Sequence, residues 1–200
     1  HLLRRQRQMC IRDRPLDQDE WGMHYVALNA PNIMPGNPMG YQWFDLYING
    51  VYISDAGPKE YKIIDEVITA NVTKIKNTID IILQNMKLSM NDCFIMGFSQ
   101  GGIMAFELGR SLTETLGGVA IISSRIIKRE NDSNTFFQRT PIFISHGGKD
   151  DILPISNYYQ SLEILDKQNF HYESHLIEED THTMSPETIK LFQKFVKKNI

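Results

Sequence analysis

A serine stands between two glycines in the sequence GFSQG, residues 97–101. This G-x-S-x-G pattern follows an apolar run at 93–96 and precedes a run with helical spacing. At a sharp turn from strand to helix, called a nucleophile elbow, a serine exposes its hydroxyl for attack on a carbonyl carbon. The helix N-terminus adds positive potential, and the Gln100 N–H would donate to an oxyanion. Ser99 is therefore a candidate nucleophile, with a glycine-rich phosphate turn or a plain strand–helix connection as alternatives.

The glycines two residues before and two residues after Ser99 fit the same interpretation. A nucleophile elbow is so tight that it strains the backbone of the serine. We expect side chains at Gly97 and Gly101 to collide, so that both positions must be glycine. We also expect Ser99 to adopt a strained backbone conformation.

A serine hydroxyl is a weak nucleophile unless a base takes its proton and a carboxylate orients that base. In folds built on a nucleophile elbow, the chain order is serine, then acid, then histidine. Asp150 and Asp151 follow an expected strand at 141–145, and His182 lies between the last expected strand and the last expected helix. We predict Asp150 as the orienting acid and His182 as the base, with Asp151 as the alternative acid.

Three other histidines lie near these segments. His146 is attractive as a base, but it precedes both acid candidates and so breaks the chain order. His171 and His175 lie on one face of an expected strand, where structural or surface roles are more common. A metal site is the rival chemistry, because Asp150, Asp151 and His182 are also ligand types for divalent metals. The chain has no C-x-x-C pair, and we predict no metal.

Composition restricts the class of partner and the compartment. A net charge of −3 gives no reason to expect nucleic acid or an anionic membrane. Cys10 and Cys93 are far apart, which argues against a disulfide framework and for a reducing compartment, the cytoplasm. No apolar run approaches the roughly 18 residues of a spanning helix, so stable membrane insertion is not expected.

The elements that must position these residues alternate between strand and helix patterns. Expected strands lie at 25–28, 92–98, 118–122, 141–145 and 171–177, and expected helices at 60–88, 100–110, 155–168 and after Ser185. The proline-rich segment 31–40 is expected to be a loop. The strands are continuous apolar runs, which is typical of a parallel sheet covered by helices on both faces. Ligands bind beyond the carboxyl ends of such strands, where the three candidate residues would lie.

We predict one domain at 15–200, preceded by a non-native or disordered segment at 1–14. This length fits one domain of ordinary size. The arginine-rich first residues lack the apolar region of a signal peptide. Within them, RQMCIRDR resembles translated sequencing-adapter read-through, and a basic arm is the alternative interpretation.

Together these residues resemble the carboxylesterase/phospholipase family of α/β-hydrolases, which includes acyl-protein thioesterases and bacterial carboxylesterases. The run GFSQGG at 97–102 carries most of the resemblance. Further similar stretches are NAP at 29–31, WFD at 43–45 and HGGKD at 146–150, with Leu153 following. The resemblance covers roughly residues 24–200 and implies an α/β-hydrolase fold.

Carried over residue by residue, the resemblance implies a nucleophile, an acid and a base at Ser99, Asp150 and His182. It implies that Gln100 donates its backbone N–H to the oxyanion hole. Trp43 and Leu153 would bind substrate near the acyl pocket, with plain core packing as the alternative for Trp43. The resemblance implies no metal and no organic cofactor.

The implied function is that of a carboxylesterase-type serine hydrolase, which cleaves esters of small to medium acyl chains through an acyl-enzyme. Acyl-protein thioesterase or lysophospholipase activity on longer chains is the first alternative. A non-catalytic or impaired hydrolase-like protein and a peptidase on the same fold are further alternatives. The expected partner is a small-molecule ester or thioester, and the sequence leaves a homodimer open.

One element of the family's pattern does not occur in this chain. The family begins with a central strand ending in L-H-G-x-G, whose loop gives the second oxyanion N–H, and no such element precedes Tyr25. We therefore expect an N-terminally truncated form of an active esterase. Losing one oxyanion donor lowers the rate by about 10²- to 10³-fold.

Overall fold

The computed structural model describes residues 23–53, 57–128 and 137–200. The prediction for residues 1–14 lies outside the described residues. The chain divides into two compact units, His1–Gln42 and Trp43–Ile200, and each is described by itself. In the part that the structure describes, no helix is both long enough and apolar enough to cross a membrane.

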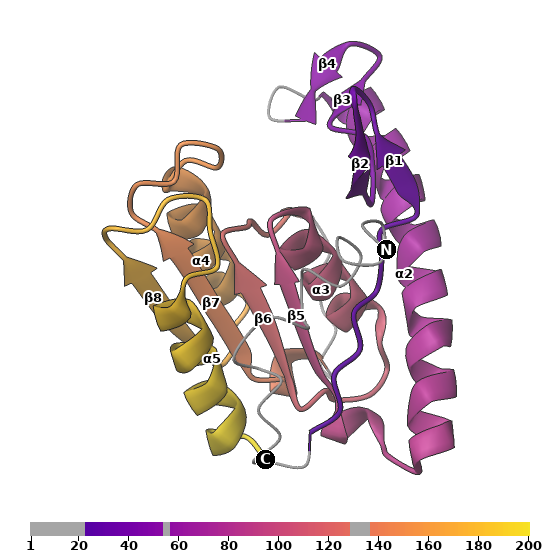
Figure 1. Ribbon diagram of the computed structural model, residues 1–200, viewed down its shortest axis with the longest axis vertical. Coiled ribbons are helices and arrows are strands. Elements are labelled where there is room, and N and C mark those ends of the chain that lie inside the picture. Colours follow the sequence, from indigo (N-terminus) through magenta and orange to yellow (C-terminus); the bar gives the residue numbers. More distant parts are fainter. Residues whose placement is uncertain (1–22, 54–56, 129–136) are drawn as a thin grey trace. The chain divides into compact units, whose positions relative to one another are not determined.

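The first unit contains a hairpin in which β1 (Asn32–Met34) pairs antiparallel with β2 (Asn37–Gln42) (Figure 1). The expectation of a loop at 31–40 is therefore wrong. Pro35 and Gly36 stand between the two strands, and Gly36 has a φ of 75°. Proline followed by a residue with positive φ suits the centre of a type II turn, which here closes a hairpin rather than preventing one.

Residues 25–28 were expected to form a buried strand, and this expectation is also wrong. The segment has no regular secondary structure, and Val26 and Leu28 are exposed. A strand is stable only when its N–H and C=O groups pair with a neighbouring strand. None of the ladders formed by the described residues includes this segment.

The second unit contains a four-stranded sheet with the order β5-β6-β7-β8, in which every neighbouring pair is parallel. Its strands are β5 (Phe94–Phe98), β6 (Gly118–Ile122), β7 (Ile142–Gly147) and β8 (Tyr172–Ile177). All residues of β6 and β7 are buried, which explains why these strands read as continuous apolar runs. The predicted parallel sheet is confirmed. Figure 1 shows the carboxyl ends of its four strands at one edge.

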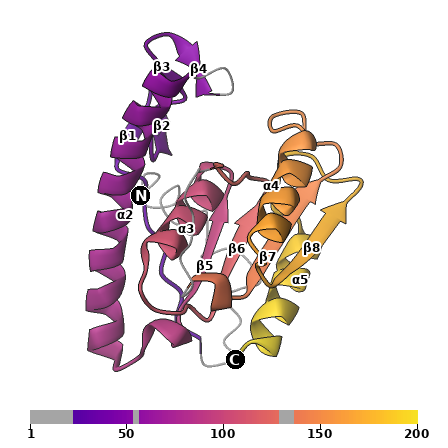
Figure 2. The ribbon, with the colours of Figure 1, turned by 180° about the vertical axis from the view of Figure 1, so that it is seen from behind.

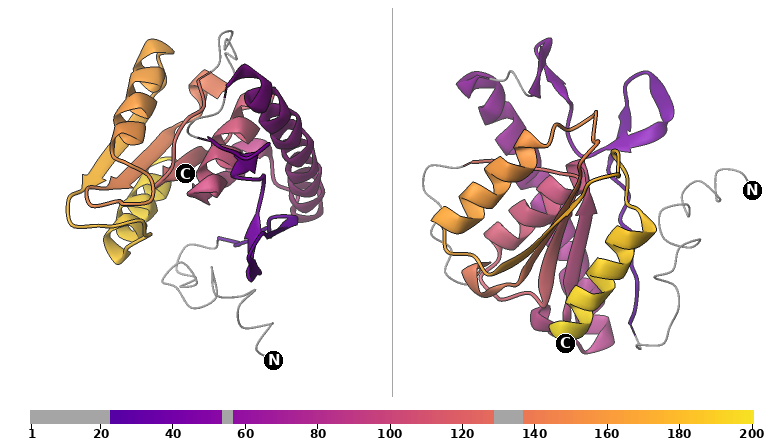
Figure 3. Two further views of the ribbon diagram at one scale, coloured as in Figure 1. Left: turned by 90° about the horizontal axis from the view of Figure 1, so that it is seen from above. Right: turned by 90° about the vertical axis from the view of Figure 1, so that its left-hand side faces the viewer.

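Helices cover both faces of this sheet, as predicted. They are α2 (Pro58–Met86), α3 (Gln100–Ser111), α4 (Ser156–Lys167) and α5 (Pro186–Lys198). Figures 1 and 2 show α3 and α4 on one face and α5 on the other, and Figure 3 shows the same layers from two further sides. Helix α2 packs against α3.

The second unit also contains shorter elements. They are the hairpin of β3 (Tyr47–Ile48) and β4 (Val51–Tyr52) and the 3-10 turns η3 (Met90–Asp92) and η4 (Phe137–Arg139).

The start of α5 follows its sequence signals closely. The Ser185 hydroxyl accepts a hydrogen bond of 3.2 Å from the Thr188 N–H, and Pro186 occupies the first helical position. The predicted inner face of the helix is buried at Ile189, Phe192, Phe195 and Val196. The capping residue and the spacing of the apolar residues in the sequence therefore predict where this helix begins and which face is buried.

An aromatic cluster anchors α3, the helix that begins at Gln100. The Phe106 ring is fully buried and lies 4.9 Å from the Phe137 ring and 5.7 Å from the Phe170 ring, between centroids. Phe137 and Phe170 also contact each other at 5.0 Å. Buried aromatic side chains contribute large apolar areas, so this cluster holds α3 in place.

We expect Phe106→Ala to lower the free energy of unfolding by about 3–5 kcal/mol, because the cavity removes ring contacts on two sides. Phe106→Leu, the matched control, retains most of the volume and should cost clearly less. Urea denaturation followed by circular dichroism measures both. Equal losses in the two variants would contradict the role of the ring cluster.

Candidate active site

Ser99 occupies the turn between β5 and α3 with φ 53° and ψ −122°. A positive φ at a non-glycine residue is a strained conformation that surrounding structure must hold in place. A Cβ atom built on Gly97 would lie 1.9 Å from the carbonyl oxygen of Gly101. No side chain is compatible with that distance, so the tight turn requires glycine at position 97. The predicted strain at Ser99 is confirmed.

The same geometry corrects the expectation for Gly101. A Cβ atom built there meets no heavy atom within 4 Å, so a side chain would not collide. The backbone of Gly101, rather than its missing side chain, approaches position 97. The next glycine is the crowded one, because a Cβ on Gly102 would lie 2.5 Å from the Cβ of Ser124. Steric crowding therefore requires glycine at positions 97 and 102.

The structure brings Asp150 and His182 together. His182 Nδ1 lies 2.8 Å from Asp150 Oδ2, and the Asp150 side chain is fully buried while that of His182 is 15% exposed. The other carboxylate oxygen of Asp150 accepts hydrogen bonds from the Ile152 and Leu153 N–H groups at 3.0 and 2.7 Å. With Nδ1–H donated to the carboxylate, Nε2 of the neutral imidazole is left as the proton acceptor. Asp151 is exposed.

Contacts between two loops place His182 beside Asp150. The N–H groups of Gly148 and Lys149 donate to the carbonyls of Ile177 and Asp180, each at 2.8 Å. A Cβ on Gly147 would lie 2.4 Å from the Asp180 oxygen, so the loops touch backbone to backbone. The glycines of the HGGKD stretch thus allow the segment after β8 to pack on the segment after β7.

His182 also lies close to the elbow. Its ring is 4.8 Å from the ring of Phe98, the residue before Ser99, between centroids. The next residue, Thr183, accepts a hydrogen bond of 3.4 Å from the Ser123 hydroxyl through its carbonyl. Among the described residues, Ser99 and His182 form no hydrogen bond with each other. Catalytic hydrogen bonds are often long without substrate and tighten when substrate binds.

The Gln100 side chain ties the Trp43–Phe44 segment to the elbow. Its Oε1 accepts from the Trp43 N–H and its Nε2 donates to the Phe44 carbonyl, both at 3.0 Å. Buried Asn71 donates to the Trp43 carbonyl at 2.6 Å. Trp43, predicted to bind substrate, is thus fixed next to the helix that carries Gln100.

Leu153, the other residue predicted near the acyl pocket, is held mainly through its backbone. Its N–H donates to Asp150, and its carbonyl accepts from His146 Nε2 at 2.9 Å. His146 is buried and its Nε2 lies 3.6 Å from Asp150 Oδ2. His146 therefore supports the loop that carries Asp150.

Two further side chains with reactive groups lie outside this arrangement. Burial lowers the pKa of His175, whose ring lies 5.2 Å from the Phe143 ring on the sheet. Burial raises the pKa of Cys93 to about 11, so its thiol is protonated at neutral pH. A protonated thiol is a poor nucleophile.

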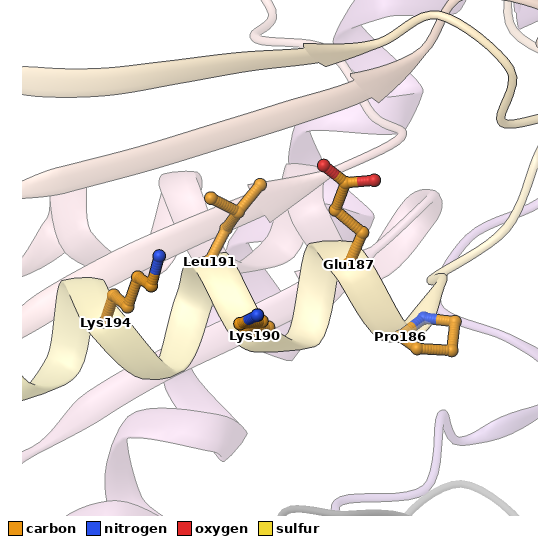
Figure 4. Close-up of a pocket in the computed structure, with 5 residues that line it drawn as sticks. All are labelled: Pro186, Glu187, Lys190, Leu191 and Lys194. Carbon is orange, nitrogen blue, oxygen red and sulfur yellow. The ribbon is translucent and has the colours of Figure 1, made fainter.

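The described part of the chain offers no ready metal site, because no three or more His, Cys, Asp or Glu side chains gather there to hold an ion. A pocket of about 380 Å³ lies on the surface of α5. Figure 4 shows the side chains that line it. It is lined by Pro186, Glu187, Lys190, Leu191 and Lys194. None of these residues belongs to the arrangement around Ser99.

Two side chains that support the site were not among the residues predicted from the sequence. Ser123 and Ser124 directly follow β6 and are buried, and their hydroxyls bond to the carbonyls of Thr183 and Ser99. The position of Ser123 and Ser124 directly after a strand could have predicted them, because residues after every parallel strand lie at the ligand-binding edge of the sheet. The site residues predicted from the sequence follow only β5, β7 and β8.

A family model described as Phospholipase/Carboxylesterase matches residues 17–200. The chain is similar to Acyl-protein thioesterase 1 of Emericella nidulans, with 33% identity over 115 residues that cover 52% of this chain and 46% of that protein. It therefore spans about half the length of that relative. Acyl-protein thioesterase 1 of Saccharomyces cerevisiae is 26% identical over 188 residues, which cover 88% of this chain and 74% of that protein.

A solved structure, that of Arabidopsis thaliana SOBER1, superimposes with a TM-score of 0.64 and 21% identity. The match covers 86% of this chain and 80% of that chain. At this identity the similarity shows the fold alone. Together with the family model, it confirms the predicted α/β-hydrolase fold.

We expect Gly97→Ala to prevent the elbow from forming, because its methyl group would overlap the Gly101 carbonyl. Gly101→Ala is the matched control. It should be tolerated, with up to about 1 kcal/mol of added stability from the helix propensity of alanine. Thermal unfolding by circular dichroism compares the two. A Gly97→Ala protein as stable as Gly101→Ala would contradict the tight-turn geometry.

Proposed function

Because the chain belongs to the phospholipase/carboxylesterase family, whose model matches residues 17–200, we propose that it is a serine hydrolase of carboxylic esters. The family points to a hydrolase of the esterase or thioesterase type. The observation that carries the proposal is the 2.8 Å hydrogen bond between buried Asp150 and His182, near the strained Ser99. We propose acyl chains of small to medium length as the substrates.

In the first half of the proposed reaction, Ser99 Oγ attacks the ester carbonyl carbon while His182 Nε2 accepts the hydroxyl proton. Asp150 stabilises the imidazolium that forms, and the Gln100 N–H donates to the developing oxyanion. The tetrahedral intermediate then breaks its bond to the leaving oxygen. His182 donates the proton to that oxygen, so an alcohol leaves and an acyl-serine ester remains.

In the second half, water takes the place of the alcohol. His182 accepts a proton from the water, whose oxygen attacks the acyl carbon of the ester on Ser99. Collapse of the second tetrahedral intermediate returns the proton to Ser99 Oγ and releases a carboxylic acid. Each turnover thus consumes one ester and one water, and the proposed chemistry uses only side chains and a backbone N–H.

Thioester hydrolysis is the second candidate function. Two of the relatives are named Acyl-protein thioesterase 1, which favours this candidate. The proposed residues would serve equally well, because a thiol leaves from the tetrahedral intermediate more readily than an alcohol.

The free Cys93 and the wide separation of the two cysteines in the sequence support a reducing compartment, and we propose the cytoplasm.

We expect the chain to hydrolyse p-nitrophenyl esters, and Ser99→Ala to reduce kcat on the order of 10⁴- to 10⁶-fold. Matched thioesters of the same acyl length, followed by release of free thiol, separate the two candidate functions. A fluorophosphonate probe should label Ser99 in the unsubstituted chain and not in Ser99→Ala. Turnover that survives in Ser99→Ala would remove the nucleophile assignment.

We expect Trp43→Ala to change the preference for acyl-chain length, because we propose that Trp43 lines the acyl pocket. The kcat/KM ratio between long and short p-nitrophenyl esters should rise by on the order of tenfold. Tyr47→Ala, which removes an aromatic ring that is 60% exposed, is the matched control and should leave the ratio unchanged. If Trp43→Ala only lowers the melting temperature, Trp43 is a core residue instead.

A further inference from the structure

The carbonyl group of Ser99 is held by two donors. The Ser124 hydroxyl donates to it at 2.6 Å, and the Gly102 N–H donates to it at 2.9 Å. The Gly102 bond belongs to the first turn of α3, so the Ser124 bond is an additional, tertiary one. Ser124 lies beyond the end of β6 and is 2% exposed, so water does not compete for this bond.

The Ser99 carbonyl and the Gln100 N–H belong to the same peptide group. A peptide group is planar and trans, so its C=O and N–H point in opposite directions and cannot turn independently. Fixing the carbonyl therefore fixes the direction of the N–H. Because the Gln100 N–H is the proposed oxyanion donor, the Ser124 hydroxyl acts on the oxyanion hole through this peptide.

Neighbouring contacts make Ser124 a rigid support. The preceding residue, Ser123, has a positive φ of 42°, and its N–H donates to the Ser145 carbonyl of β7 at 2.9 Å. A Cβ atom built on Gly102 would lie 2.5 Å from Ser124 Cβ and 2.6 Å from Ser124 Oγ. The side chain of Ser124 therefore occupies the space that a side chain at position 102 would need. The last glycine of GFSQGG, Gly102, therefore makes room for this hydroxyl.

We infer that Ser124 is a positioning residue of the oxyanion hole, which aims the Gln100 N–H at the developing oxyanion. This inference rests on the proposed function, since it concerns the same reaction. The hydrogen bond from Ser124 to the Ser99 carbonyl already exists before substrate binds. Its effect on the reaction appears only when the oxyanion forms and accepts a hydrogen bond from the Gln100 N–H. Ser124 should therefore influence kcat far more than KM.

Ser124→Ala, made in the 200-residue chain, tests the inference. We expect kcat for p-nitrophenyl esters to fall by about 10- to 100-fold, less than the 10²- to 10³-fold typical of deleting a donor, with KM changed less than about twofold. An alkyl trifluoromethyl ketone, which forms a tetrahedral oxyanion adduct with serine, should lose affinity by the same factor as kcat/KM.

Ser145→Ala is the matched control. Within the described residues, the Ser145 hydroxyl is buried without a hydrogen-bond partner, and it stands near the end of the neighbouring strand. Its removal should leave kcat and ketone affinity unchanged. Ser124→Cys retains a side chain of similar shape with a much weaker donor, and it should reproduce the loss in kcat even if Ser124→Ala folds poorly.

A kcat in either Ser124 variant within about twofold of the unsubstituted chain, or a rise in KM alone, would overturn the inference. The proposed function fails differently. If the unsubstituted chain neither turns over esters nor reacts with a fluorophosphonate, both ideas fall together. Turnover that requires Ser99 but proceeds at the full rate without the Ser124 hydroxyl overturns the positioning role alone.

Discussion

Helix α3 begins two residues after strand β5 ends, and this turn leaves no room for a Cβ atom at position 97. The close approach forces Ser99 into a conformation that isolated chains rarely adopt. The surrounding structure stabilises it: the Ser99 N–H donates to the Ile122 carbonyl at 3.0 Å, and the ring contacts of Phe106 anchor α3 in the core. The conformation of the elbow thus depends on a buried core.

The parallel sheet then determines which other residues can reach this serine. Because all four strands run in one direction, the loops that follow them meet at one edge. Asp150 and His182 are separated by 32 positions in the chain, yet backbone contacts between their loops bring them to 2.8 Å. The buried Asp150 carboxylate has hydrogen-bond donors on both oxygens, which offsets the cost of removing it from water.

Backbone groups contribute as much to this site as side chains do. One peptide group joins the Ser99 carbonyl, which Ser124 and α3 hold, to the Gln100 N–H, which points away from it. The Gln100 side chain meanwhile binds both the N–H of Trp43 and the carbonyl of Phe44. A single residue after the serine therefore connects the elbow with the segment proposed to line the acyl pocket.

The amino-acid sequence by itself determined the parallel sheet, its helices, the cap of α5 at Ser185 and the turn at Ser99, because these depend on local spacing of apolar, glycine and capping residues. It failed at 25–28, where a strand requires a partner, and at 31–40, where a turn at Pro35 and Gly36 closes a hairpin. It also failed at Gly101, where free space depends on neighbouring elements. Only the tertiary structure decided that His182 pairs with Asp150 rather than with exposed Asp151, and that Ser124 holds the Ser99 carbonyl. These contacts join residues 25 or more positions apart, and no local pattern in the sequence specifies which distant groups will meet.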